Sequence, residues 1–449
     1  RRIARFAETI PDEKWVMGVG FRRMSWEDTS MPDAGTLDAV IADRPVFLMD
    51  EELHMAWLNS RGLQECGIDK NTEAPDGGII CRDENGEPTG VLLENAVALA
   101  AKHAFEFDKK TVKQLIEGYI DKAVSLGITS VSDMTPYLSL DLSFPEVYFE
   151  MVSNNELKIR VNAARNLFED INTFNEIRQK ADLEGKGFYR VPYMKQFIDG
   201  TPANFTGMLL EDYSDNPGEK GKATIDLDKM AAAIETATEN NISVRLHSCG
   251  DRSCREAINA YENALKKFPE TESRHMVEHL ELVDPNDIPR FGQLGIICSI
   301  QPEHLAAGTM KWEENCYPEK LGPERERYTW PFKQLKDNGA VLAGGTDCPV
   351  VEGNLFWGMY AGNTRKYYDD IPEGGWNPQE KLTMPEMIDM FTSGAAYAEH
   401  RENELGTLEE GKLADITVVD RNLLELEENP DIRDTKVLLT MVDGRVVYS

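Results

Sequence analysis

Short apolar runs alternate with amphipathic stretches through most of the chain. Over residues 112–123 apolar side chains recur every three or four positions, which predicts a helix. Gly127 follows, and the apolar run 128–131 predicts a strand that ends near Asp133. Further strands are predicted over 190–198, 242–246, 276–280, 295–300 and 340–343, and further helices over 227–237 and 257–265, the last with a cap at Ser253.

This alternation predicts the fold class. Strands that alternate with helices are typical of βαβ units around a parallel sheet, and continuous apolar strands fit a sheet covered on both faces. Ionisable residues stand at the ends of successive strands, as they do around the active-site rim of a TIM-type (β/α)8 barrel. A doubly wound open sheet is the alternative, but it normally binds ligands at one switch point instead of around a ring of strand ends.

The C-terminal segment has a different pattern. Strands are predicted over 415–419, 437–442 and 445–448. Asp443-Gly444, between the last two, is a strong signal for a two-residue hairpin. Three short strands with one apolar face are not stable alone, so we expect residues 401–449 to form half of a small β-sandwich.

The remaining residues, 1–400, are expected to form the barrel domain. The region 21–97 is long for one strand-to-helix connection, so it is expected to hold a cap insertion over the pocket. Three aromatic residues of this region are expected to contact either an organic substituent of the substrate or the core of the cap, namely Phe21, Trp26 and Trp57.

The composition mainly excludes certain classes of binding partner. Of the 449 residues, 48 are Lys or Arg and 79 are Asp or Glu, and the net charge of −31 argues against binding nucleic acid or an anionic membrane. No apolar run approaches a membrane span, and the first residues lack the apolar core of a signal peptide. The seven cysteines form no C-x-x-C pair, which favours a reducing, cytoplasmic location. The sequence carries no signal of an oligomeric state.

Four ionisable residues stand at or near the ends of apolar strands. They are Lys195, His247, His279 and Asp347. Burying such groups is costly unless they are paired or bind a metal, and neutral imidazole and carboxylate oxygen are common zinc ligands. The four residues therefore form a candidate metal site. Each comes from a different strand, so each histidine taken singly also fits a hydrogen-bonded structural residue.

The order and flanking residues of these segments resemble the amidohydrolase superfamily. Within it they resemble amidohydrolase family 3, the YtcJ-like group that includes N-substituted formamide deformylases. The resemblance covers nearly the whole chain. Besides the four strand-end segments, it rests on the residue runs 15–21, 43–48, 54–60, 90–94, 299–304 and 411–415.

This resemblance implies a distorted barrel joined to a small β-sandwich. It also implies a metal-dependent hydrolase that cleaves a C–N bond of a small amide-like substrate through a metal-activated water, with zinc or another divalent metal as cofactor. By position, Lys195 resembles the carboxylated bridging lysine, His247 and His279 the ligands on strands five and six, and Asp347 the aspartate on strand eight. His275 is the alternative ligand on strand six.

The resemblance also suggests roles in catalysis. Asp347 is expected to accept a proton from the attacking water and return it to the departing nitrogen. His304 is expected to donate to the developing oxyanion or hold the substrate carbonyl, with a structural histidine as the alternative. His54 and Asp199 are expected to help bind the substrate, His54 from the pocket wall and Asp199 through the loop after Lys195.

One motif of the family is absent from this sequence. The family has an H-x-H pair on the first barrel strand, but no two of the seven histidines here are separated by one residue. The chain begins where the helix after that strand is expected, so we expect the first strand and half of the sandwich to be missing. An incomplete sequence is the favoured explanation, because a barrel that lacks a strand exposes two edges, and a short paralogue is the alternative. If the chain is complete, poor catalysis is expected.

Two alternatives to an amide hydrolase stay open. A cyclic-amide hydrolase or a deaminase would use the same strand-end residues, because the substrate loops decide between these reactions. A catalytically silent or truncated homologue that acts as a binding or structural protein is suggested by the absent H-x-H pair.

Overall fold

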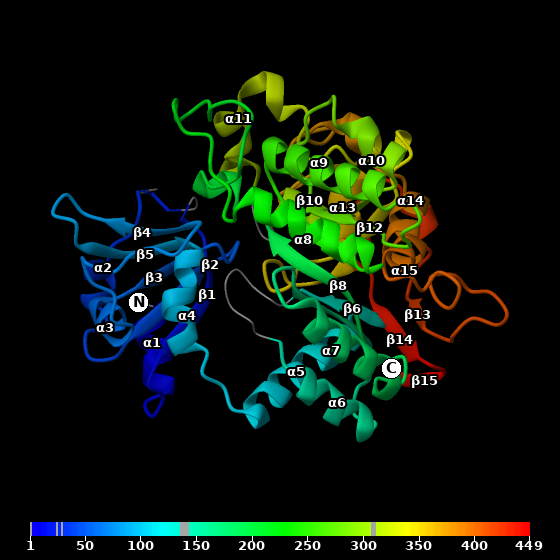
Figure 1. Ribbon diagram of the computed structural model, residues 1–449, viewed down its shortest axis with the longest axis horizontal. Coiled ribbons are helices and arrows are strands. Elements are labelled where there is room, and N and C mark those ends of the chain that lie inside the picture. Colours follow the sequence, from blue (N-terminus) through cyan, green and yellow to red (C-terminus); the bar gives the residue numbers. More distant parts are fainter. Residues whose placement is uncertain (1, 24–25, 28–29, 135–142, 307–310) are drawn as a thin grey trace.

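A computed structural model describes residues 2–23, 26–27, 30–134, 143–306 and 311–449. These residues form three sheets, and the N-terminal sheet lies beside the body that holds the other two (Figure 1). Among these residues no helix has the length and apolar character needed to cross a membrane.

The central sheet contains seven parallel strands. In spatial order they are β6 (Ser130–Asp133), β7 (Arg160–Asn166), β8 (Tyr189–Phe197), β9 (Ser243–Ser248), β10 (Met276–His279), β11 (Ile297–Ile300) and β12 (Leu342–Gly344). Spatial order follows chain order without the reversal of a doubly wound sheet, which confirms the predicted TIM-like arrangement. Closure into eight strands is not seen among the described residues.

Helices connect these strands and pack on the outer face of the sheet (Figure 1). They include α5 (Lys109–Ser125), α6 (Pro145–Ser153), α7 (Ile171–Glu184), α8 (Leu227–Glu239), α9 (Asp251–Lys267), α10 (Ile288–Leu294) and α12 (Phe332–Asp337). The predicted cap of α9 at Ser253 is wrong. Gly250 is the N-cap residue. Ser253 lies inside the first turn of the helix, where its hydroxyl donates a hydrogen bond to Asp199.

The N-terminal sheet has the order β1-β2-β3-β5-β4. Its strands are β1 (Val16–Phe21), β2 (Val46–Asp50), β3 (Met55–Leu58), β4 (Gly78–Arg82) and β5 (Pro88–Glu94). Apolar side chains are buried on both of its faces. Phe21, Trp26 and Trp57 pack together with ring centres 5.8–5.9 Å apart and lie in one of these cores, which favours the core role for the three aromatic residues.

The C-terminal sheet is antiparallel and contains β13 (Ile416–Val419), β14 (Val437–Val442) and β15 (Arg445–Tyr448). The predicted hairpin is confirmed: Asp443 and Gly444 both have positive φ, at 53° and 74°, as a type I′ turn requires. On its inner side the sheet packs against α5, where the Thr440 hydroxyl donates to the carbonyl of Val124 at 2.6 Å. Its outer side exposes apolar residues, including Leu438 and Val446.

A buried ion pair ties this C-terminal sheet to the central one. The Arg160 guanidinium donates to both carboxylate oxygens of Asp415, at 2.8 and 2.9 Å, and both side chains are at most 5% exposed. Removing one partner leaves a buried charge uncompensated.

We therefore expect Arg160→Met to lower the free energy of unfolding by about 3–5 kcal/mol, measured by urea denaturation. Lys158→Met is the control, because Lys158 forms an exposed pair with Asp121 and its loss should leave the midpoint close to that of the wild type. Equal midpoints for the two variants would contradict a structural role of the Arg160–Asp415 pair.

Candidate metal centre

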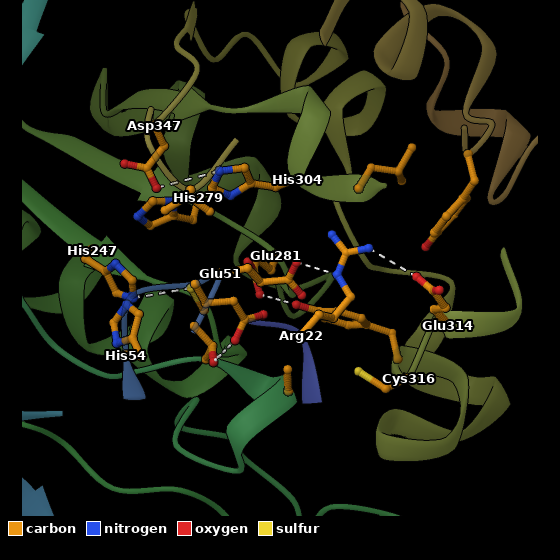
Figure 2. Close-up of a pocket in the computed structure, with 18 residues that line it drawn as sticks. Arg22, Glu51, His54, His247, His279, Glu281, His304, Glu314, Cys316 and Asp347 are labelled. Carbon is orange, nitrogen blue, oxygen red and sulfur yellow. Dashed lines mark hydrogen bonds and ion pairs between the residues drawn. The ribbon is translucent and has the colours of Figure 1, made fainter. Parts of the chain in front are cut away.

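A cleft opens at the carboxyl ends of the central strands and contains about 750 Å³ of empty space, part of it continuous with solvent. His247 lies on β9, His279 is the last residue of β10, His304 lies in the turn Pro302–Leu305 after β11, and Asp347 follows β12. All four line the cleft (Figure 2). Parallel strands end at one edge of a sheet, so residues far apart in sequence meet there.

These cleft residues form a continuous group. The ring centres of His247 and His279 are 4.3 Å apart, and those of His279 and His304 are 5.7 Å apart. His304 Nε2 lies 3.6 Å from Asp347 Oδ2. Potential ligand atoms of His279, His304 and Asp347 all lie within 4.8 Å of one another, so the three side chains can reach one cation.

Lys195 approaches the same group from within β8. It is 2% exposed, and its Nζ has no hydrogen-bond partner among the described residues. The Nζ atom lies 4.1 Å from the ring centre of Phe197. Burial lowers the pKa of Lys195 to about 8, although Glu278 and Asp347 favour its charged form. The amine is therefore closer to its neutral state than an exposed lysine.

Burial also keeps the imidazoles neutral. It lowers the pKa of His279 to about 3, and it holds the pKa of His247 well below the usual value, with His279 adding to the effect. Neutral imidazole is the form that binds metals. His279 and Asp347 also have left-handed backbone conformations, with φ of 75° and 59°, and such conformations collect at functional sites.

His275 does not reach the cleft, although it lies only four residues before His279. Its ring stacks on Tyr261, with centres 4.5 Å apart, and its two nitrogens contact the Thr238 hydroxyl and the backbone N–H of Val244. Both polar atoms of His275 are thus occupied in the core. The structure brings His279 and not this alternative to the other strand-end residues.

Asp199 is completely buried behind the cleft wall. Its carboxylate accepts hydrogen bonds from the backbone N–H groups of Met208, Cys249 and Gly250 and from the Ser253 hydroxyl, at 2.7–3.1 Å. These contacts hold the loop after β8 against the start of α9. Asp199 is not among the described residues that line the cleft, but its Oδ1 lies 4.0 Å from His247 Nε2, so it shapes the loop directly beside the candidate centre.

The N-terminal sheet contributes one wall of the cleft. His54 is buried there, and its ring centre lies 5.0 Å from that of His247. Its Nδ1 lies 2.7 Å from Glu94 Oε2. Burial alone would lower the pKa of His54, but the Glu94 carboxylate raises it to about 9. Asn59, in the same segment, caps α3 (Ser60–Glu65) by accepting a hydrogen bond from the Gly62 N–H.

Carboxylates that the sequence pattern did not predict line the outer cleft. Glu51, Glu52 and Glu281 line it, and Arg22 forms ion pairs with Glu51 and Glu314 (Figure 2). Burial, followed by repulsion from Glu52, raises the pKa of Glu281 to about 8. Glu281 lies two residues after His279, so its position just beyond a strand end could have identified it from the sequence. The other carboxylates depend on how the N-terminal sheet docks, which no local pattern reports.

A parallel TIM-like sheet that gathers imidazoles and a carboxylate at its carboxyl ends has the arrangement of a metal-dependent hydrolase. The chain belongs to the amidohydrolase family, whose model matches residues 1–448. The resemblance predicted from the sequence is confirmed.

Two curated relatives and one solved structure illustrate this similarity. YtcJ of Bacillus subtilis is 28% identical over 443 residues, which cover 98% of this chain and 80% of YtcJ. The N-substituted formamide deformylase of Arthrobacter pascens is 25% identical over 456 residues, which cover 99% of this chain and 81% of the deformylase. The structure of an uncharacterized metal-dependent hydrolase from Pyrococcus horikoshii has a TM-score of 0.71 at 23% identity, and the match covers 95% of this chain and 80% of that hydrolase.

Family membership supports metal-dependent hydrolase activity on a small molecule. It lends no support to a catalytically silent homologue or to the expectation of poor catalysis.

The contrast between His279 and His275 gives a direct test of the candidate centre. We expect His279→Ala to weaken zinc binding by at least about 10–100-fold, because losing a ligand costs no less than losing its outer-shell partner. His275→Ala should retain zinc and lose about 1–3 kcal/mol of stability, because it leaves the N–H of Val244 without its acceptor. Zinc content after dialysis and thermal unfolding measure the two effects. Zinc lost from His275→Ala alone would contradict this assignment.

Proposed function

We propose that this protein is a metal-dependent hydrolase that cleaves a C–N bond of an amide-like small molecule. The observation that carries the proposal is the meeting of His247, His279 and Asp347, from three different strands, next to the buried amine of Lys195. A core position alone does not explain a lysine whose Nζ lacks a hydrogen-bond partner in the described part of the chain, because burying an unpaired amine is costly.

The donor set fits a divalent cation, and zinc in particular. His247 and His279 offer neutral imidazole nitrogens, and Asp347 offers a carboxylate oxygen, all ligand types that zinc accepts. Lys195 would join them after its neutral amine reacts with carbon dioxide to form a carbamate, whose two oxygens suit a bridging ligand. The lowered pKa of Lys195 supports this reaction, because only the uncharged amine is nucleophilic.

A bound divalent metal would supply an acidified water and polarise the substrate carbonyl. Asp347 is partly open to the cleft and, in this proposal, accepts the proton of the attacking water and returns it to the departing nitrogen. His304, 3.6 Å from Asp347 and lining the same cleft, orients the substrate carbonyl and stabilises the developing negative charge.

The N-terminal sheet, whose strands β2 to β5 lie within the expected insertion 21–97, acts as the cap of this site. Glu51, Glu52 and His54 reach the cleft from it, which supports that role. The similarity to an N-substituted formamide deformylase suggests N-formyl amines as the first substrates to examine. All seven cysteines are free thiols, which supports a reducing, cytoplasmic environment.

The decisive experiment is hydrolysis of a panel of N-formyl and N-acyl amines by the zinc-loaded protein. We expect turnover with at least one of these amides, and a loss of about 10²–10⁴-fold in kcat for Asp347→Asn, because amide cannot accept the proton. Asp337→Asn is the control, since this exposed aspartate only pairs with Lys333 on the surface.

Lys195→Ala should lose both zinc and activity. Absence of hydrolysis for every amide by protein that holds stoichiometric zinc would refute the proposed function.

A further inference from the structure

The outer cleft carries more negative than positive side chains. Four glutamates line it, whereas Arg22 is the one lysine or arginine among the described lining residues. Arg22 forms ion pairs with Glu51 and Glu314 (Figure 2). The other two glutamates, Glu52 and Glu281, form no ion pair with a lysine or arginine in the described part of the chain.

Neutral groups hold Glu52 and Glu281 in place and leave one oxygen of each available. Glu52 Oε2 accepts from the Thr201 hydroxyl at 2.6 Å, and Glu281 Oε2 accepts from the Tyr317 hydroxyl at 2.5 Å. Neither Oε1 atom has a hydrogen-bond partner among the described residues. Glu281 is only 6% exposed, and a buried carboxylate is costly unless it is paired. An unpartnered oxygen at the cleft wall therefore points to a ligand that donates hydrogen bonds.

Two other basic side chains near this region are already paired. His54 Nδ1 lies 2.7 Å from Glu94 Oε2, so this carboxylate balances a charged imidazole. Lys320 Nζ lies 3.6 Å from Asp215, and Lys320 is not among the described residues that line the cleft. Neither cation forms an ion pair with the two outer glutamates.

Tyr367 gives a second observation that does not depend on the carboxylates. Its side chain lines the cleft and is 1% exposed, and its hydroxyl has no hydrogen-bond partner among the described residues. Burial, followed by the Cys316 thiol, raises the pKa of Tyr367 well above its usual value. Cys316 also lines the cleft, so the hydroxyl lies on the cleft side of the ring. Buried hydroxyls normally have a partner, and a ligand can supply one here.

These acceptors select the chemistry of the ligand. Carboxylate and hydroxyl oxygens accept hydrogen bonds from N–H groups, and an ammonium or guanidinium supplies both the donors and the positive charge. The described side chains whose ligand atoms are close enough to hold a metal ion do not include Glu52 or Glu281, which favours an organic cation. Ala203, Leu305 and Val350 also line the cleft, so a hydrocarbon segment of the ligand matches its apolar surface.

We propose that the outer cleft binds a positively charged nitrogen group between Glu52 and Glu281, and that the substrate is an amide that carries such a group on an apolar chain. The second part rests on the proposed function. Glu52 follows β2 and Glu281 follows β10, so this ligand contacts both the cap and the barrel. Burial, followed by repulsion from Asp50, raises the pKa of Glu52 to about 7, and a bound cation would favour its ionised form.

The test uses sulfonamides, which resemble amides but resist hydrolysis. N-(4-aminobutyl)methanesulfonamide carries an ammonium group where N-pentylmethanesulfonamide carries a methyl group, and pairs with shorter and longer chains cover the length of the cleft. Calorimetric titration of the zinc-loaded full chain gives a Kd for each compound. We expect the ammonium compound to bind about 10–100-fold more tightly, because hydrogen bonds to charged groups are strong.

Variants of the outer cleft should reduce this preference. Glu52→Gln and Glu281→Gln should each lower the ratio of the two Kd values about tenfold, because each removes a negative charge and keeps the shape of the side chain. Tyr367→Phe should lower it about 2–10-fold, because it removes a neutral acceptor.

Glu324→Gln is the matched control. This exposed glutamate of α11 (Tyr317–Glu326) is not among the described lining residues, and its replacement changes the net charge by the same amount, so the ratio should equal that of the wild type. Circular dichroism and thermal unfolding verify that each variant folds. Should one glutamine variant fail to fold, the other decides.

The outcomes separate this inference from the proposed function. Equal affinity for the two sulfonamides, or a preference that both glutamine variants retain, would overturn the inference. Hydrolysis of N-pentylformamide without a preference for N-(4-aminobutyl)formamide would leave the proposed function standing and overturn the cationic substrate. Tighter binding of the ammonium compound without hydrolysis of any amide would refute the proposed function and support the cation site alone.

Discussion

The structure depends on charge balance inside the central sheet, directly below the candidate metal centre. Arg245 on β9 donates to Glu278 on β10 at 2.5 Å and to Glu399 at 3.0 Å, and all three side chains are almost fully buried. Glu278 also attracts Lys195, and these two cations lower its pKa despite burial. Each buried charge therefore has an opposite partner nearby, as the low-dielectric interior requires. Because Arg245 forms the direct hydrogen bond to Glu278, the Lys195 amine is left without a hydrogen-bond partner among the described residues.

Much of this framework could be predicted from the sequence because it follows local rules. Apolar runs located six of the seven central strands to within a few residues but missed β7, and the Asp-Gly turn located the C-terminal hairpin. Strand-end position also favoured His279 over His275, because parallel strands bring their last residues to one edge while earlier residues face the interior. The strand-end residues lie together as predicted, because the carboxyl ends of neighbouring parallel strands must lie at the same edge of the sheet.

The remaining features depend on contacts between distant elements. Glu94 is 40 residues from His54, and only the β3–β5 register makes them neighbours. The carboxylates of the outer cleft depend on the docking of one sheet against another, which has no local signal. Asp199 is a further example: its place after Lys195 predicts a role through the loop beside the site, but only the tertiary structure shows that backbone N–H groups from two later segments bind its carboxylate.

The cleft lies where the N-terminal sheet meets the barrel, and few direct bonds join the two near it. Thr201 donates to Glu52 at 2.6 Å, and Asn204 donates to Asp50 at 3.2 Å. Each hydrogen bond of this kind contributes only modestly to the stability of the docked arrangement. A ligand that binds only this arrangement stabilises it by RT ln(1 + [L]/Kd), which is about 2.7 kcal/mol when the ligand concentration is a hundred times Kd. A small molecule in this cleft that contacts residues of both parts, such as Glu52 and His304, would therefore also stabilise the docked position of the cap. Binding of the ligand and positioning of the cap would then be coupled.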